Sequence, residues 1–179
     1  MFDFFHVFAT QASAWVKATA QTYPYWVFPI AFVIAGSESF IGLSFLVPAT
    51  ILLLALGTMI GATHIGLVPA ITGAVVGSII CDWIAWWIGF HYHHKIVHFR
   101  LFRRFEAEIE KGLHFFHRWG TWGIFIGRFM GPFRATVPLV AGMSELRFWP
   151  FMIPNAISAV IWAVGLLAFP AFVARYLLT

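Results

Sequence analysis

Charged residues are scarce in this chain. Only 10% of its 179 residues are Asp, Glu, Lys or Arg, whereas 61% are apolar. Soluble domains carry about 25% charged residues, so the composition leaves no room for a separate water-soluble domain. It predicts an all-α, polytopic membrane protein with a single domain over residues 1–179.

Cysteine is almost absent. The single one, Cys81, lies in an apolar run and excludes an intrachain disulfide, so we expect it to be a small packing residue. The net charge of +4 does not indicate nucleic-acid binding, because the basic residues gather in one stretch beside the predicted membrane segments. We expect neither a cofactor nor a nucleic-acid partner.

The stretch 121–143 is apolar and yet contains two arginines. An arginine that faces lipid near the bilayer centre costs about 2.5–3.5 kcal/mol on insertion scales, so Arg128 and Arg134 are expected to face a polar interior. Prolines and glycines interrupt the stretch, which predicts a broken or re-entrant helix that lines a cavity. The interrupting positions are Gly131, Pro132, Pro138 and Gly142.

Two guanidiniums beside helix N-termini favour an anion in that cavity. The alternative is that the arginines snorkel to the membrane surface and that the prolines only end short helices.

The first half of the chain has a similar pattern. An apolar segment over 24–36 is followed by Glu38, and an apolar run over 40–62 is interrupted by Pro48. Interrupted segments in both halves are typical of transporters built from repeats, with the site between the repeats. Glu38 is expected to pair with an arginine or to carry a proton. The alternative is that it caps a helix N-terminus.

Two longer apolar segments, 64–90 and 156–174, are predicted to span the membrane. Asn155 precedes the second one and needs a polar partner. Asp82 is the only charge in the first, and a tryptophan belt around it, formed by Trp83, Trp86 and Trp87, suggests a position near the membrane surface. Glycines four residues apart predict close helix contacts at Gly57 and Gly61, Gly73 and Gly77, and Gly127 and Gly131.

Residues 91–118 form a long polar stretch. They hold six of the eleven Lys and Arg residues against three glutamates, which predicts a cytoplasmic loop by the positive-inside rule. Interleaved apolar residues predict amphipathic helices on the membrane surface. Six histidines fall here, and His94 with His98 has helical spacing for metal ligation. Surface-facing histidines explain the pattern equally well, and we expect no metal site.

Several motifs together resemble one family. Residues 127–142, GRFMGPFRATVPLVAG, are similar to a motif R-F-x-x-x-x-R followed by P-x-x-A-G, and an F-x-x-x-N pattern ends at Asn155, with a tryptophan at Trp162. Residues 82–89, DWIAWWIG, partly match G-D-x-I-G-Y-x-I-G. The chain thereby resembles the DedA family, the bacterial branch of the SNARE-associated Golgi protein (VTT domain) superfamily, over residues 30–165.

The resemblance implies two inverted re-entrant helical hairpins packed against transmembrane helices in the bacterial inner (plasma) membrane. It implies a flippase of a lipid phosphate carrier, polyprenyl (undecaprenyl) phosphate, that supports envelope biogenesis and membrane homeostasis. The implied substrate-binding residues are Arg128, Arg134, Glu38 and Asn155, and the implied proton-coupling residues are Glu38 and Asp82.

The chain departs from the family pattern at Thr50, where many members have an acidic residue. Coupling to the proton motive force is therefore open. Without an acidic partner at position 50, Glu38 is expected to titrate as one site, and Thr50→Ala is expected to change little.

Other functions are alternatives to lipid-phosphate transport. They are a proton-coupled exporter of small cations or drugs, a general phospholipid scramblase, a lipid phosphatase and an assembly role. An exporter would have an acidic site without an anion motif, and a phosphatase needs a nucleophilic histidine near the arginines. We therefore expect a transporter rather than an enzyme, and homo-oligomerisation is open.

Overall fold

The computed structural model describes residues 24–38, 49–63, 66–96, 118–129 and 134–178, together with residues 11, 114 and 116. Regular structure in these ranges is helical, without strands, which confirms the predicted all-α class. In chain order the elements are η1 (Pro24–Trp26), α2 (Val27–Ser37), α4 (Ala49–Gly61), α5 (Leu67–Ile96), α7 (Trp122–Gly127), α8 (Val137–Met143) and α9 (Phe148–Leu178).

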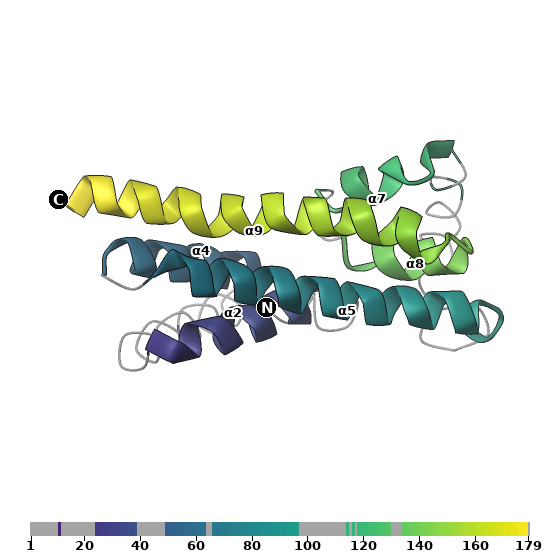
Figure 1. The fold of residues 1–179 in the computed structure, drawn as a ribbon, viewed down its shortest axis with the longest axis horizontal. Helices are drawn as coiled ribbons and strands as arrows, with labels where there is room; N and C mark the ends of the chain where they lie inside the picture. The colour runs from purple at the N-terminus through teal and green to yellow at the C-terminus, as the bar shows by residue number, and fades with distance from the viewer. Residues whose placement is uncertain are drawn as a thin grey trace.

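Two long helices, α5 and α9, run antiparallel along the length of the molecule (Figure 1). Within them, Leu67–Tyr92 and Phe148–Leu177 are long and apolar enough to cross a membrane. The helices fall where the two apolar segments were predicted, with different ends. α5 continues to Ile96, so the first six residues of the predicted loop 91–118 are helical. α9 begins eight residues earlier than the predicted run, since Pro150 lies in its first turn, where no N–H bond is lost.

The shorter helices lie at opposite ends of this long pair. α2 and α4 occupy the end where α5 begins, and α7 and α8 occupy the end where α9 begins (Figure 1). The packing crosses between the two halves of the chain, because α4 contacts α9 and α8 contacts α5. Each half therefore completes the core of the other.

Glycines allow these helices to approach closely. A Cβ at Gly73 or Gly77 would clash with the backbone of α2, and a Cβ at Gly57 or Gly61 would clash with the backbone of α9. The predicted function of these two glycine pairs in close packing is confirmed. Gly142 of α8 makes the same kind of contact with the backbone of α5 at Trp86.

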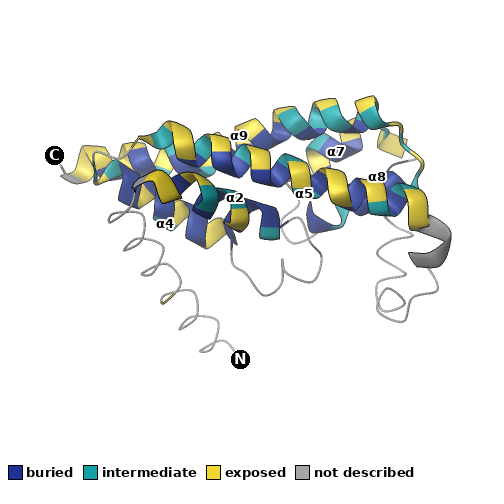
Figure 2. Cartoon of the chain, turned by 60° about the horizontal axis from the view of Figure 1, so that its bottom comes forward, coloured by how far each residue is buried: buried dark blue, intermediate teal, exposed yellow. Residues whose placement is uncertain are grey.

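The interior contains two hydrophobic clusters. One joins α2, α4, the first part of α5 and the last part of α9, and includes Leu53, Ala74 and Leu167. The other lies at the opposite end and includes Trp86, Val140 and Phe151. Buried and exposed residues alternate along each helix, so that one face of the helix is buried and the other is exposed (Figure 2).

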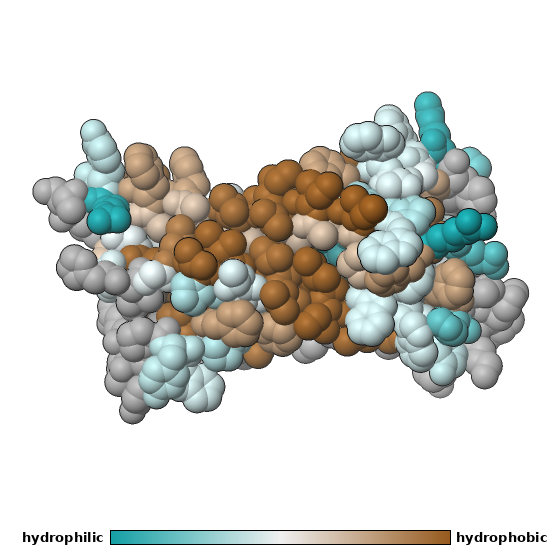
Figure 3. All heavy atoms as spheres, in the orientation of Figure 1, coloured by the Kyte–Doolittle hydropathy of each residue, from teal (hydrophilic) through white to brown (hydrophobic). Residues whose placement is uncertain are grey.

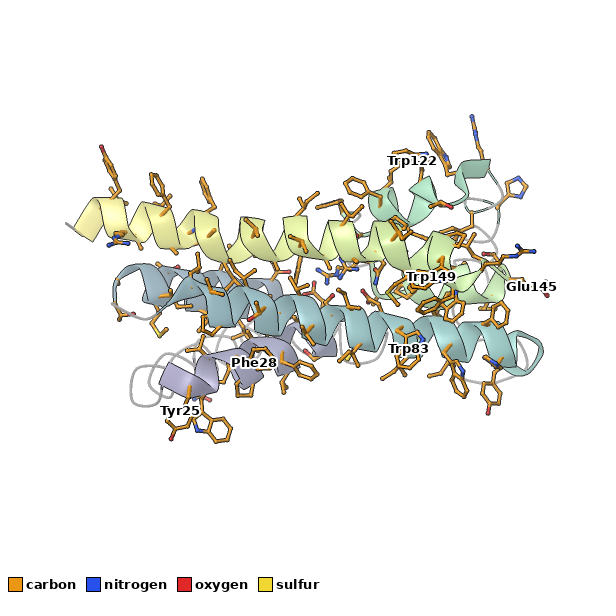
Figure 4. All side chains as sticks on the ribbon, viewed as in Figure 1. Tyr25, Phe28, Trp83, Trp122, Glu145 and Trp149 are labelled. Carbon is orange, nitrogen blue, oxygen red and sulfur yellow. The ribbon has the colours of Figure 1, made fainter. Side chains whose placement is uncertain are left out.

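The exterior is apolar in the middle and more polar at both ends. Hydrophobic residues form a continuous band across the face seen in Figure 3, and hydrophilic residues lie toward its two ends. Exposed aromatic residues flank this band, with Tyr25 toward one end and Trp122 and Trp149 toward the other (Figure 4). Such a surface is suited to a bilayer with aromatic side chains at both interfaces.

Several predictions lie outside the described residues. These are the structural functions of Pro48, Gly131 and Pro132, and most of the predicted surface loop 91–118. Pro138 is described and lies in the first turn of α8, where proline is compatible with helix formation.

Candidate functional site

A buried polar layer separates the two hydrophobic clusters. On α5, Ser78 and Asp82 lie between Ala74 of the first cluster and Trp86 of the second. On α9, Asn155 and Ser158 lie between Phe151 and Trp162 in the same way. The layer also contains three further buried charged residues, which are Glu38, Arg128 and Arg134.

Arg128 is tightly held within this layer. It occupies the C-cap of α7, and its Nη1 donates to Asp82 Oδ2 at 2.6 Å. Its Nη1 also donates to Asn155 Oδ1, and its Nη2 donates to Ser78 Oγ. Ser78 and Asp82 are four residues apart, so both point from the same face of α5. Arg128 thus links α7, α5 and α9.

Arg134 has a different environment. It precedes α8, and its Nη1 lies 3.3 Å from Glu38 Oε1 without forming a well-directed hydrogen bond. Neither Nη1 nor Nη2 has a hydrogen-bond partner among the described residues, although Arg134 is only 7% exposed. Its Cζ lies 3.9 Å from the centre of the Trp162 ring, which is a cation–π contact.

Glu38 lies where α2 ends and α4 begins. It is the C-cap residue of α2, and its Oε1 accepts a hydrogen bond from Thr50 Oγ1 in the first turn of α4, at 3.2 Å. Its Oε2 has no hydrogen-bond partner within the described part of the chain. The carboxylate therefore contacts a side chain in the first turn of α4 and also pairs with an arginine.

The charges are divided between the two halves of the chain. Both carboxylates, Glu38 and Asp82, come from the first half, and both guanidiniums come from the second. Each ion pair therefore joins the halves. The cluster contains two carboxyl groups and two guanidiniums, and it has spare donors at Arg134, at Arg128 Nε and at Asn155 Nδ2. A site with unused donors and few unused acceptors is chemically suited to an anion.

The structure bears on two of the sequence-based expectations. Arg128 and Arg134 are both buried, so the interpretation that they snorkel to the surface is wrong. Asp82, which was expected near the membrane surface, is 3% exposed, lies near the middle of α5 and pairs with Arg128. Trp86, which was assigned to the tryptophan belt, is buried and donates from Nε1 to the Leu146 carbonyl.

Three residues that contact the charged groups of the layer were not predicted as site residues. Ser78 and Trp162 contact the two guanidiniums, and Thr50 contacts Glu38. The position of Ser78, one helical turn before Asp82, was an available signal. The hydrogen bond from Thr50 revises the expectation that Thr50→Ala changes little.

Comparisons with known proteins show the family of the chain. A model of the VTT domain matches residues 47–171. The chain belongs to the VTT-domain (DedA) family of membrane proteins. The VTT match contains Asp82, both arginines and Asn155, whereas Glu38 precedes it.

Several curated DedA-type proteins are similar to the chain. Inner membrane protein YabI of Escherichia coli is 31% identical over 72% of this chain and 51% of its own length. Undecaprenyl phosphate transporter A of Bacillus subtilis is 24% identical over 66% of this chain and 61% of its own length. An uncharacterized membrane protein of Mycobacterium tuberculosis, Rv2637, is 27% identical over 88% of this chain and 74% of its own length.

The chain spans about half the length of the first of these relatives. No solved structure matches it.

Proposed function

We propose that the chain forms the core of a transporter that moves a lipid phosphate, with polyprenyl (undecaprenyl) phosphate as the expected substrate, across the bacterial inner membrane. The observation that carries this proposal is the buried Arg134 guanidinium, whose two terminal nitrogens have no acceptor among the described residues. A buried unsatisfied donor costs about 1–3 kcal/mol, and more when it is charged. A phosphate headgroup would remove that cost, and its apolar tail would stay in lipid.

The proposed membrane arrangement is a pair of oppositely inserted re-entrant hairpins. α2 has 11 residues and α4 has 13, so at 1.5 Å per residue they are about 17 and 20 Å long. A bilayer core is about 30 Å thick, and α5 and α9 alone of the described helices are long enough to cross it. The hairpins α2–α4 and α7–α8 would enter from opposite sides, and the polar layer would lie near the middle of the bilayer.

We assign different functions to the two arginines. Arg134 is the principal phosphate ligand, because its donors are unused and its carboxylate contact is loose. The terminal nitrogens of Arg128 already donate to Asp82, Asn155 and Ser78. Arg128 therefore holds the site together and orients Asn155. The free Nδ2 of Asn155 is a second donor for the phosphate.

Glu38 competes with the phosphate for Arg134. When Glu38 is ionised, the buried cluster is neutral, and a phosphate adds about 1.5 to 2 negative charges. Protonation of Glu38 removes one negative charge and frees the guanidinium. This competition is the proposed basis for proton coupling at Glu38. Asp82 is less suited to that function, because it is held by Arg128 at 2.6 Å.

The same contacts argue against a proton-coupled exporter of cations. A cation site needs a carboxylate that is free to bind positive charge. Both buried carboxylates already face an arginine, and the spare groups of the layer are mostly donors.

The proposal is tested with purified protein in liposomes. Labelled C55 isoprenyl phosphate should cross the bilayer faster with wild-type protein than with correctly inserted Arg134→Gln protein, which should be close to protein-free liposomes. Labelled phosphatidylglycerol is the control substrate and should not be accelerated. Equal acceleration of both lipids would indicate a general scramblase, and wild-type transport by Arg134→Gln would refute the assignment of the headgroup site.

A further inference from the structure

The indole of Trp162 occupies a defined place beside Arg134. Its ring centre is 3.9 Å from the guanidinium carbon, and Trp162 as a residue is 9% exposed. Trp162 is seven residues after Asn155, which is about two turns along the same face of α9. One face of α9 therefore contacts Arg128 through Asn155 and Arg134 through Trp162.

An aromatic ring stabilises a buried guanidinium in an unusual way. Hydrogen-bond acceptors such as a carboxylate or an amide oxygen stabilise a buried arginine by accepting hydrogen bonds from its N–H groups, which are then occupied. The face of an indole ring attracts the cation electrostatically and occupies none of them. The difference is visible within this layer, since Arg128 is held by acceptors and Arg134 is held by a ring.

We propose that Trp162 is a positioning residue that keeps Arg134 buried, in place and free to bind the phosphate of the transported lipid. This inference rests on the proposed function of Arg134. Without the ring, Glu38 would be the chief remaining stabiliser of the Arg134 charge, since it is the carboxylate that faces the guanidinium. Thr50 donates to that carboxylate and does not contact the arginine. The ion pair would tighten, and the phosphate would have to break a stronger contact.

The test compares two substitutions that both shorten the side chain. Trp162→Phe keeps an aromatic face, whereas Trp162→Met keeps only apolar volume. Binding of C55 isoprenyl phosphate to purified protein should weaken about 3- to 30-fold in Trp162→Met, the range expected for a lost cation–π contact, and clearly less in Trp162→Phe. Trp149→Met is the matched control on α9, since Trp149 is 67% exposed and lies in the first turn of that helix (Figure 4).

The Glu38→Gln background distinguishes a positioning function of Trp162 from a packing function. If Trp162 acts by offsetting the attraction between Glu38 and Arg134, Trp162→Met should lose less than about twofold in affinity once residue 38 is neutral. The same loss in both backgrounds, or equal losses for Phe and Met, would show that Trp162 only fills space and would overturn the inference.

A measurement without ligand keeps the inference separate from the proposed function. Trp162→Met should lower the melting temperature of the empty protein by less in an Arg134→Met background than in the native one, because the ring then has no cation to hold. If wild-type protein fails to bind C55 isoprenyl phosphate, the proposed function fails, and this thermal comparison still decides the contact. Equal falls in melting temperature in the two backgrounds would refute it.

Discussion

At the scale of single residues, the two arginines differ in ways that their sequence context does not reveal. Both were predicted to be buried because exposure to lipid is costly. Their partners depend on how each helix is rotated in the fold, which residue spacing does not determine. Arg128 has three polar partners and Arg134 has one loose ion pair and a ring.

This difference predicts that the same substitution, Arg to Gln, affects stability at Arg128 and transport at Arg134. Arg128→Gln leaves Asp82 as a buried, uncompensated carboxylate, which should cost about 3–5 kcal/mol of stability. Arg134→Gln breaks a looser contact and should preserve folding while abolishing lipid-phosphate transport. Detergent melting curves and liposome transport, measured on both variants, check the division. Similar stability of the two variants would contradict it.

The charge of Glu38 predicts an effect on lipid binding. An ionised Glu38 pairs with Arg134 and competes with the phosphate for the guanidinium. The charged groups around the contact are Glu38, Arg134, Arg128 and Asp82. Glu38→Gln should therefore bind C55 isoprenyl phosphate more tightly than wild-type protein at the same pH. If the two proteins bind it equally, Glu38 has only a structural function.

Thr50 provides a milder perturbation of the same group. Its hydroxyl donates to Glu38 Oε1 at 3.2 Å, and the same oxygen faces Arg134 Nη1. Thr50→Val removes that donor with little change in volume, so Glu38 should pair more tightly with Arg134 and binding of C55 isoprenyl phosphate should weaken. An unchanged affinity would show that the hydrogen bond is not energetically important.

At the scale of the helices, the sequence predicted more of the structure than it did at the site. Apolar length and glycine spacing were the informative patterns. The two long helices and the close contacts at Gly57, Gly61, Gly73 and Gly77 follow from apolar length and small-residue spacing. The helix ends were harder to predict, because α9 continues through Pro154. Trp86 is buried, although in sequence it resembles a residue of an interfacial belt, because residue type alone does not show which way a side chain of α5 points.

Glycine contacts give a prediction with an internal control. A Cβ at Gly61 would clash with the Ala171 carbonyl, whereas a Cβ at Gly165 on α9 meets nothing within 4 Å. Gly61→Ala should therefore lower the melting temperature and the yield of inserted protein. Gly165→Ala should be neutral or stabilising by about 0.5–1 kcal/mol, since alanine favours a helix. A harmless Gly61→Ala would contradict the close packing of α4 on α9.

At the scale of the whole molecule, the antiparallel arrangement of α5 and α9 predicts the sidedness of their ends. The sequence 91–118 links the end of α5 to the second half and is predicted to be cytoplasmic. In a Cys81→Ser background, Glu108→Cys and Glu145→Cys should resist membrane-impermeant thiol reagents in intact cells, whereas Tyr176→Cys, at the far end of α9, should react (Figure 1). Labelling of all three from one side would contradict membrane-spanning α9.

The most direct test of the central claim is a comparison of two ligands that differ only in the headgroup. Binding of C55 isoprenyl phosphate and of the corresponding C55 alcohol is measured for wild-type and Arg134→Gln protein in nanodiscs of neutral lipid. Wild-type protein should prefer the phosphate strongly, because the phosphate engages the unused donors of Arg134. Arg134→Gln should bind the two lipids almost equally. An undiminished preference for the phosphate in Arg134→Gln would contradict the assignment of Arg134 as the ligand of the headgroup.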